Sequence, residues 1–282
     1  MSNQLGALYV VATPIGNLDD LSPRALLTLN EVSLIAAEDT RHSSKLLRHF
    51  GILTPVIAFH EHNEREKAAE LVAYLISGKS IALISDAGTP LVSDPGYRLV
   101  RAAHAAGIRV IPLPGACAAI VALSASGLPS DRFAFEGFPP VKSAARRAWF
   151  EALAGEPRTL IVYESPHRIV ESLQDMLAVF GAEREAVYAR ELTKQFETVR
   201  HATLGEMVRW VTEDANQQRG EIVVLIHGAA PVAAETSEDA ARILRILLQE
   251  LPVRQAAALA AEITGQKKNQ LYELALQFKQ TR

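Results

Sequence analysis

The sequence predicts an α/β protein made of two α/β domains and a small C-terminal helical unit. Short apolar runs alternate with helical spacing through most of the chain, and three runs end in turns of glycine, proline and small polar residues. Nearly continuous hydrophobicity is typical of parallel strands covered on both faces. The three turns lie at Thr13–Asn17, Ser85–Pro90 and Pro114–Cys117. Because ligands of open α/β sheets bind outside the carboxyl ends of strands, the functional site is expected there.

The first domain is predicted at residues 1–116. Its strands are expected at the apolar runs Ala7–Ala12, Ser33–Ala37, Pro55–Phe59, Ser80–Ser85 and Ile108–Leu113. The segments between them have helical spacing, at Ser22–Asn30, Ser43–Phe50, Asn63–Ser77 and Gly96–Ala106. This alternation indicates a largely parallel sheet with helices on its faces.

The second domain is predicted at residues 117–230 and begins with a helix at Cys117–Ser126. A further α/β series follows. Its strands are expected at Phe133–Glu136, Arg158–Tyr163, Ala186–Arg190, Val199–Thr203 and Glu221–His227. Its helices are expected at Ala144–Leu153, Ile169–Phe180 and Gly205–Thr212.

The third segment, residues 231–282, follows an alanine-rich linker at Gly228–Ser237. Apolar residues recur at helical spacing in three stretches, and Thr264–Gln266 forms a tight glycine turn between the last two. This is the outline of a helix-turn-helix unit. Its tip is locally basic, since two acids stand against five basic residues, namely Arg254, Lys267, Lys268, Lys279 and Arg282.

Composition narrows the function classes. The single cysteine, Cys117, excludes an internal disulfide and a cysteine-rich zinc site. No signal peptide or bilayer-length apolar stretch is present, so a cytoplasmic protein without membrane contact is expected. The formal net charge of −3 gives no global attraction to nucleic acid, and any such binding must use local patches.

The strand-end turns favour a ligand with hydroxyls and an amine. Neither the dinucleotide fingerprint nor the phosphate-binding P-loop follows a strand, which disfavours a nicotinamide cofactor or ATP. The turns instead carry Thr13, Asp86, Thr89 and Ser93. The structural alternative is that Asp86 and Asp94 only shape turns or cap helices.

Residues 38–44 form the densest cluster of reactive side chains, directly after a predicted strand. Glu38 and Asp39 have carboxylates that can orient a hydroxyl or accept its proton, while Arg41, His42 and Lys45 can hold phosphates. The structural alternative is a helix start capped by Thr40 or Asp39. Capping accounts for one or two of these residues but not for the whole run, so a functional role is favoured.

Weaker signals lie elsewhere. Tyr163–Arg168 follows another strand, although Glu164 and Arg168 can also form a purely structural pair. Lys142, Arg146 and Arg147 form a basic run on a predicted helix, and most such runs are solvated faces. The histidines lack metal-ligand spacing, so no metal site is predicted.

Four segments together resemble the tetrapyrrole-methylase-like, S-adenosylmethionine-dependent methyltransferases. In chain order they are Val11–Leu18, Ala37–Arg41, Ser85–Pro90 and Pro114–Ala116. Within that superfamily, the second segment and Tyr163–Arg168 resemble a branch that methylates the ribose 2′-hydroxyl of a cytidine in the decoding region of 16S rRNA. The resemblance spans nearly the whole chain. The broader superfamily often has Gly-Asp-Pro where this chain has Ser85, Asp86 and Ala87, so of these three positions only Asp86 matches.

The resemblance implies S-adenosylmethionine bound in a cleft between two α/β domains, a homodimer, and 16S rRNA of the small ribosomal subunit as the partner. It also implies a helix-turn-helix extension, which matches Glu238–Gln280. The cofactor residues it implies in the first half are Pro14, Asp86, Ala87, Gly88, Pro90, Leu91, Ser93, Gly115, Ala116 and Cys117. Those in the second half are Tyr163, Arg190, Gly220 and Glu221.

Methyl transfer to a ribose hydroxyl needs that hydroxyl aligned with the methyl–sulfur axis and a nearby group to take its proton. We expect Glu38 or Asp39 to take the proton and Arg41 and Lys45 to hold neighbouring phosphates. Two other functions stay open. One is methylation of a porphyrin-like small molecule, against which the basic residues and the C-terminal unit count. The other is a noncatalytic RNA-binding module.

Overall fold

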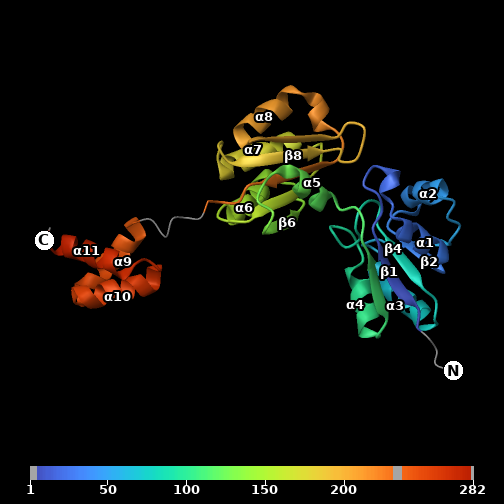
Figure 1. The fold of residues 1–282 in the computed structure, drawn as a ribbon, viewed down its shortest axis with the longest axis horizontal. Helices are drawn as coiled ribbons and strands as arrows, with labels where there is room; N and C mark the ends of the chain where they lie inside the picture. The colour runs from blue at the N-terminus through green and yellow to red at the C-terminus, as the bar shows by residue number, and fades with distance from the viewer. Residues whose placement is uncertain (1–4, 231–236, 281–282) are drawn as a thin grey trace. The chain divides into compact units, whose positions relative to one another are not determined.

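The computed structural model describes residues 5–230 and 237–280. It divides into two compact units, the larger comprising Met1–Ala152 with Arg158–His227 and the smaller comprising Leu153–Pro157 with Gly228–Arg282. The larger unit contains two five-stranded sheets with flanking helices (Figure 1). Within the described ranges, no helix is both long and apolar enough to cross a bilayer.

The first sheet is entirely parallel, as the alternating pattern predicts. Its order is β3-β2-β4-β1-β5, so the first strand of the chain lies inside the sheet. The strands are β1 (Ala7–Val11), β2 (Leu34–Ala37), β3 (Val56–Ala58), β4 (Ile81–Ile84) and β5 (Arg109–Leu113). Every residue of β4 is buried, as expected for a strand covered on both faces.

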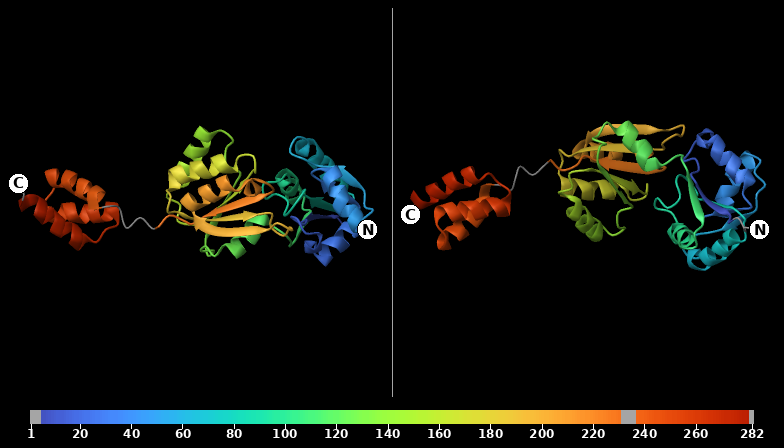
Figure 2. Two further views of the ribbon diagram at one scale, coloured as in Figure 1. Left: turned by 90° about the horizontal axis from the view of Figure 1, so that it is seen from above. Right: turned by 60° about the horizontal axis from the view of Figure 1, so that its bottom comes forward.

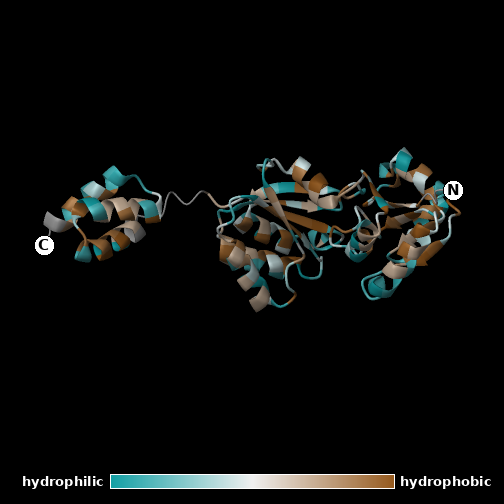
Figure 3. Ribbon diagram, turned by 90° about the horizontal axis from the view of Figure 1, so that it is seen from below, coloured by the Kyte–Doolittle hydropathy of each residue, from teal (hydrophilic) through white to brown (hydrophobic). Residues whose placement is uncertain are grey.

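Two pairs of helices cover this sheet. Helices α1 (Pro23–Glu31) and α2 (Thr40–His49) pack on one face through Leu29 and Leu47. Helices α3 (Glu64–Ile76) and α4 (Tyr97–Ala105) pack on the other face. A short 3-10 turn, η1 (Leu18–Asp20), follows β1. Figure 3 shows the apolar ribbon concentrated on strands and inner helix faces, with polar loops around them.

The second sheet is mixed rather than parallel. Its order is β6-β7-β10-β8-β9, and only β6 and β7 run parallel to each other. The strands are β6 (Phe133–Gly137), β7 (Thr159–Glu164), β8 (Glu185–Arg190), β9 (Thr198–Thr203) and β10 (Ile222–Ile226). A short connection joins β8 to β9, which permits antiparallel pairing without a crossover helix.

Helix α5 (Ala118–Ser126) packs on one face of this sheet, against residues of β7, β8 and β10. The remaining helices of the domain are α6 (Ser143–Leu153), α7 (Ile169–Phe180) and α8 (Leu204–Glu213), followed by the 3-10 turn η2 (Ala215–Gln218). Helix α8 begins with a capping box, in which Thr203 and Glu206 each bond the other's backbone N–H.

The basic run Lys142, Arg146 and Arg147 is solvated at two of its three positions, since Lys142 and Arg147 are exposed. Arg146 is fully buried, and its Nε donates to Asp175 Oδ2 on α7 at 2.7 Å. Arg147 and Ser143 donate to the other carboxylate oxygen. The expectation for Arg146 was therefore wrong, because a carboxylate distant in sequence neutralises it inside the core.

Three helices form the C-terminal unit, α9 (Ser237–Glu250), α10 (Val253–Thr264) and α11 (Lys268–Gln280). They pack around a small core that includes Leu244, Ala260 and Leu271. Gly265 ends α10 in the left-handed conformation, with φ of 68°. The helix-turn-helix outline is confirmed, and Figure 2 shows the three helices as one group. The side chain of Lys279 and the whole of Arg282, both in the predicted basic tip, lie outside the described residues.

Candidate methyl-donor site

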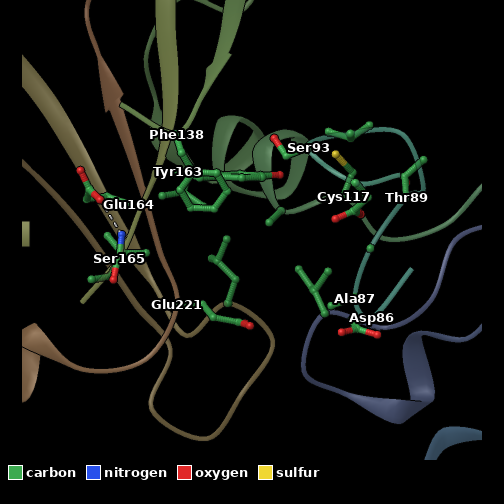
Figure 4. Close-up of a pocket in the computed structure, with 18 of the residues that line it drawn as sticks. Asp86, Ala87, Thr89, Ser93, Cys117, Phe138, Tyr163, Glu164, Ser165 and Glu221 are labelled. Carbon is green, nitrogen blue, oxygen red and sulfur yellow. Dashed lines mark hydrogen bonds between the residues drawn. The ribbon is translucent and has the colours of Figure 1, made fainter. Parts of the chain in front are cut away.

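A cavity of about 410 Å³ lies in the larger unit where loops of the two sheets meet. From the first domain, its wall is built by the turns after β1, β2 and β4. From the second domain, it is built by the start of α5, by the turns after β6, β7 and β8, and by the start of β10. In Figure 4, Asp86 and Ala87 from one domain face Glu221 from the other.

Backbone bonds hold the first-domain turns together. Thr13 and Gly88 exchange both of their backbone hydrogen bonds, at 2.9 and 3.0 Å, which joins the turn after β1 to the turn after β4. Gly88 has φ of 82°, and a Cβ there would meet Ile15 at 3.4 Å. A glycine is therefore suited to this position for both its conformation and its close neighbour.

Four non-glycine residues have left-handed backbone in the described ranges, and all four flank this cavity. Leu91 and Ser93 have φ of 73° and 66° in the loop after β4, and Glu191 and Thr193 have φ of 52° and 66° around the buried Leu192. Such conformations are costly and persist only where surrounding structure imposes them, which is a recurrent property of ligand sites.

An ion-pair network shapes the second-domain wall. Lys194 Nζ lies 2.8 Å from Glu191 Oε1 and 2.8 Å from Glu221 Oε2, so one ammonium joins two carboxylates. Glu191 also accepts the backbone N–H of Glu221 at 3.0 Å. Through these bonds the turn after β8 fixes the residue that precedes β10.

Tyr163 closes the cavity beside the start of α5. Its hydroxyl accepts the backbone N–H of Ala119 at 3.1 Å, and its ring packs edge-on against Phe135 and Phe138. Burial, and then the neighbouring Cys117, raises the pKa of Tyr163, so its hydroxyl stays protonated. Figure 4 shows this hydroxyl directed toward Ser93 and Cys117.

Three carboxylates gather at the first-domain edge. Burial, and then the charge of Asp86, raises the pKa of Glu38. Burial, and then the charge of Glu38, raises the pKa of Asp94 to about 6. Asp86 accepts the backbone N–H of Asp39 at 3.0 Å. The cavity therefore concentrates negative charge where polar, cationic or hydroxylated groups of a ligand can be bound.

Glu164 contributes a buried acceptor from the second domain. Its Oε1 accepts Arg168 Nη2 at 2.9 Å and the backbone N–H of Ser165 at 2.7 Å, so the structural pairing weighed from the sequence is present. Its Oε2 is buried without a hydrogen-bond partner, although Glu164 lines the cavity. Figure 4 shows this carboxylate pointing away from Tyr163, toward the side of Ser165.

The structure brings a subset of the predicted residues to the cavity wall. The members of that subset are Glu38, Asp86, Ala87, Gly88, Ser93, Cys117, Tyr163, Gly220 and Glu221. The predicted cofactor residues absent from the wall are Pro14, Pro90, Leu91, Gly115, Ala116 and Arg190.

Arg190 is held by hydrogen bonds to its neighbours. Its guanidinium donates to Gln217, Arg219 and Phe196 and fixes the loops around η2 and β9. Gly115 instead permits close packing, since a Cβ there would lie 2.7 Å from the Cβ of Ala12.

The remaining predicted catalytic residues also lie off the wall. Asp39 caps α2 by accepting the N–H of Arg41 at 2.7 Å and of His42 at 3.4 Å, and these bonds lower its pKa. Arg41 and Lys45 are exposed on α2.

Sequence reasoning missed the apolar wall. Ile15, Val92, Phe138, Leu192 and Val223 line the cavity. Ile15 stands in the predicted turn Thr13–Asn17 and Leu192 in the strand-end segment 190–194, but neither was assigned to the site. Phe138 lies just beyond β6, a place equivalent to the other strand-end turns, and that position was the available signal.

The model of the tetrapyrrole (corrin/porphyrin) methylases matches residues 7–208. This chain belongs to the tetrapyrrole methylase family. A second model, the RsmI C-terminal HTH domain, matches residues 234–279. A Pseudomonas aeruginosa relative, named ribosomal RNA small subunit methyltransferase I, is 63% identical over 96% of this chain and 97% of its own. A relative of the same name from Escherichia coli O157:H7 is 57% identical over 98% of this chain and 96% of its own.

Solved structures share the tetrapyrrole methylase fold. The methyltransferase CobJ superposes with a TM-score of 0.60 at 19% identity, over 80% of this chain and 95% of that one. Uroporphyrin-III C-methyl transferase from Thermus thermophilus, complexed with S-adenyl homocysteine, superposes with a TM-score of 0.54 at 18% identity. The superposition covers 79% of this chain and 97% of that one. The predicted architecture of two α/β domains and a helical extension is confirmed.

The cavity fits the methyl donor of this family. Its volume falls in the range of about 300–1000 Å³ that is usual for small-molecule sites. Apolar side chains supply a surface for an adenine ring, and the carboxylates suit an amino group, ribose hydroxyls and a sulfonium. Among the described residues, no group of three or more His, Cys, Asp and Glu is arranged to hold a metal ion.

Proposed function

We propose that this protein transfers the methyl group of S-adenosylmethionine to the ribose 2′-hydroxyl of a cytidine in the decoding region of 16S rRNA. The observation that carries this proposal is the similarity to ribosomal RNA small subunit methyltransferase I along almost the full length of both chains. The carboxylate-edged cavity of the fold supports it, because its wall offers hydrogen-bond acceptors to the polar groups of the donor.

The donor, when bound, supplies an activated methyl carbon, and the protein supplies position. Backbone and carboxylates of the turn after β4 would hold the donor from the first domain, with Tyr163, Glu164 and Glu221 opposite. Fixing the acceptor oxygen in line with the methyl group can contribute roughly 7–11 kcal/mol toward the barrier in well-oriented systems.

Of the two acids considered for contact with the hydroxyl, we assign this role to Glu38. It lines the cavity and its pKa is raised, whereas Asp39 is engaged in capping α2 and its pKa is lowered. Arg41 and Lys45 remain our candidates for phosphate contacts, since both are exposed near the same edge. We further propose a cytoplasmic homodimer acting on 16S rRNA within the small ribosomal subunit.

The test is methyl transfer from labelled S-adenosylmethionine to 30S subunits, to naked 16S rRNA and to a porphyrin, followed by mapping of the modified nucleotide. We expect one 2′-O-methylated cytidine and no labelled porphyrin. Methylation of a base, or of the porphyrin alone, would overturn the proposal. Glu38→Gln should slow transfer, while Asp39→Asn, which can still cap α2, should retain most of it. Wild-type rates from both variants would remove the role of Glu38.

A further inference from the structure

A second cavity, of about 310 Å³, adjoins the methyl-donor cavity and has no role in the proposed function so far. It is built from the turn after β2, the β3–α3 loop and the loop that leads from β4 into α4. Glu38, Ser93 and Asp94 line both cavities, so these three residues form their common wall. Glu61 and Tyr97 line only the second cavity.

The common wall is significant because of what methyl transfer demands. The donor carbon and the acceptor oxygen must approach to about 3–3.5 Å and stay aligned. Residues that touch both reactants must therefore lie where the two binding cavities meet. Only Glu38 and Asp94 on this wall have carboxylates that can take a proton.

The floor of the second cavity is rigidly constructed. Glu64, which is buried at the start of α3, accepts the backbone N–H of Gly96 at 3.1 Å and of Arg98 at 2.8 Å. These bonds satisfy two backbone N–H groups at the start of α4. They thereby fix Tyr97, which lies between Gly96 and Arg98. Ser93 is held with φ of 66°, a conformation that non-glycine residues rarely adopt.

The lining suits a nucleoside more than a phosphate. Tyr97 is 64% exposed, so the free protein leaves its ring open for contact with a base. Unstacked bases are commonly bound by stacking on aromatic side chains. Carboxylates accept hydrogen bonds from ribose hydroxyls, and they also accept from the exocyclic amine of cytosine. The same carboxylates repel phosphates, which are therefore expected outside the cavity.

Resting on the proposed function, we propose that this second cavity receives the acceptor cytidine, with its base against Tyr97, and that Asp94 takes the proton of the 2′-hydroxyl. Glu38, on the same wall, orients that hydroxyl. The ribose oxygen forms its bond to the methyl carbon as the carbon–sulfur bond breaks. The electron pair of the broken bond goes to sulfur, and the hydroxyl proton goes to the Asp94 carboxylate.

The electrostatic surroundings suit Asp94 for this step. Burial and the charge of Glu38 raise its pKa to about 6, so it is ionised at neutral pH and yet more basic than an ordinary aspartate. Ser85 donates a hydrogen bond that partly opposes the rise. The other titratable groups that face Asp94 or Glu38, or line the second cavity, are Asp39, His60, Glu61, Glu64, Asp86, Tyr97 and Tyr163.

The first test is Asp94→Asn in the full chain, assayed on 30S subunits, with Glu66→Gln as a matched control because Glu66 is exposed on α3 and lines neither cavity. We expect kcat to fall about 10²- to 10⁴-fold, with the affinity for S-adenosylmethionine measured by calorimetry unchanged within a few-fold. The wild-type rate should decline below about pH 6, and Asp94→Asn should lose this decline. Glu38→Gln should move the acid decline of the rate to lower pH, because it removes a charge that raises the pKa of Asp94.

These outcomes separate the two proposals. If the wild type methylates 30S subunits while Asp94→Asn keeps both its rate and its acid decline, this inference fails and the proposed function stands. If Asp94→Asn loses donor affinity in proportion to its rate, Asp94 is only a donor-binding residue and the inference is again overturned. If the wild type transfers no methyl group, the proposed function fails first.

The second test does not need turnover or a folded Asp94 variant. Binding of 30S subunits is measured in the presence of S-adenosylhomocysteine for Tyr97→Ala and Tyr97→Phe. We expect Tyr97→Ala to weaken binding by about tenfold to a hundredfold and Tyr97→Phe to restore it, with donor affinity equal in both. Equal 30S binding by Tyr97→Ala and the wild type would overturn the assignment of the cavity.

Discussion

The backbone N–H of Asp39 donates to Oδ1 of Asp86 at 3.0 Å and joins the turn after β2 to the turn after β4. This bond places Glu38 beside the donor cavity, although 47 positions separate the bonded residues. The side chain of Asp86 therefore connects two turns, besides standing in one of them.

Replacing Asp86 should therefore act on donor binding. Asp86→Ala removes the acceptor and a cavity carboxylate, so we expect the affinity for S-adenosylmethionine to fall about tenfold to a hundredfold, the range for a hydrogen bond to a charged group. Asp86→Asn keeps an acceptor oxygen and should lose less affinity for S-adenosylmethionine. Calorimetry measures both affinities, with circular dichroism to check the fold. Undiminished binding by Asp86→Ala would contradict the role given to this bond.

Gly220 offers a test of the second-domain wall. It has φ of 78°, and a Cβ would lie 2.4 Å from Glu191, which holds Lys194 and the backbone of Glu221. Gly220→Ala should lower stability and donor affinity together. Gly107→Ala is the matched control, because Gly107 has φ of 68° with open space around its Cβ position. Gly107→Ala should cost about 1–2 kcal/mol for its conformation alone and leave donor affinity unchanged. Urea unfolding measures the stability of both variants, and calorimetry measures their donor affinity. Equal losses in the two variants would contradict the role given to Gly220 in the cavity wall.

The buried pair of Arg146 and Asp175 should dominate the stability of the second domain. Asp175→Asn leaves the buried guanidinium with only the exposed carboxylate of Glu171, at 3.7 Å, so we expect the free energy of unfolding to fall by about 3–5 kcal/mol. Glu151→Gln, on the exposed side of α6, is the control. A loss below about 1 kcal/mol from Asp175→Asn in urea unfolding would show that Arg146 finds another partner.

The same pair predicts a pH dependence. Burial alone would raise the pKa of Asp175, but hydrogen bonds from Arg147, Arg146 and Ser143 outweigh it and lower the pKa below 3.8. The folded state therefore binds this proton more weakly than the unfolded state. The stabilisation is complete above pH 3.8 and is lost as the pH falls through the lower folded-state value. Urea midpoints measured below pH 4 should decline less steeply in Asp175→Asn than in the wild type.

The C-terminal unit should contribute salt-sensitive RNA affinity. Lys267 and Lys268 are exposed at the turn into α11. Replacing both with alanine should weaken 30S binding and reduce the slope of log affinity against log salt by about 2, as expected if each contacts one phosphate. Arg132→Ala, at an exposed loop of the larger unit, is the control. An unchanged slope would assign this unit to packing or dimerisation instead.

Local patterns predicted the elements well but not all their partners. The apolar runs identified the strands of both sheets, because burial on two faces leaves a direct mark on composition. They did not reveal that β10 pairs antiparallel with β7 and β8, because strand direction depends on how connections cross the sheet. Nor did they reveal the burial of Arg146, whose partner lies 29 positions away.

Some residues of the candidate site could likewise be predicted from the sequence, and others could not. Turns after β1 and β4 were predictable because small residues at strand ends permit close backbone approach. Phe138 and Leu192 were not predicted, since an apolar residue in a loop has no periodicity to identify its direction. Arg190 follows the pattern of a strand-end ligand residue, yet its neighbours satisfy it internally.

The position of β1 between two later strands has a consequence for biosynthesis. Its neighbours β4 and β5 come later in the chain, with Leu8 opposite Ile81 and Val110. At about 5–20 residues per second, the ribosome needs on the order of 5–20 s to make the roughly hundred residues between β1 and β5. For most of that interval the apolar segment Ala7–Val11 has neither partner strand, because β4 is made only at Ile81–Ile84, whereas the β8–β9 hairpin can close soon after it emerges. Nascent chains of this protein thus expose their first strand longest, and chaperones that bind extended apolar segments should meet it there.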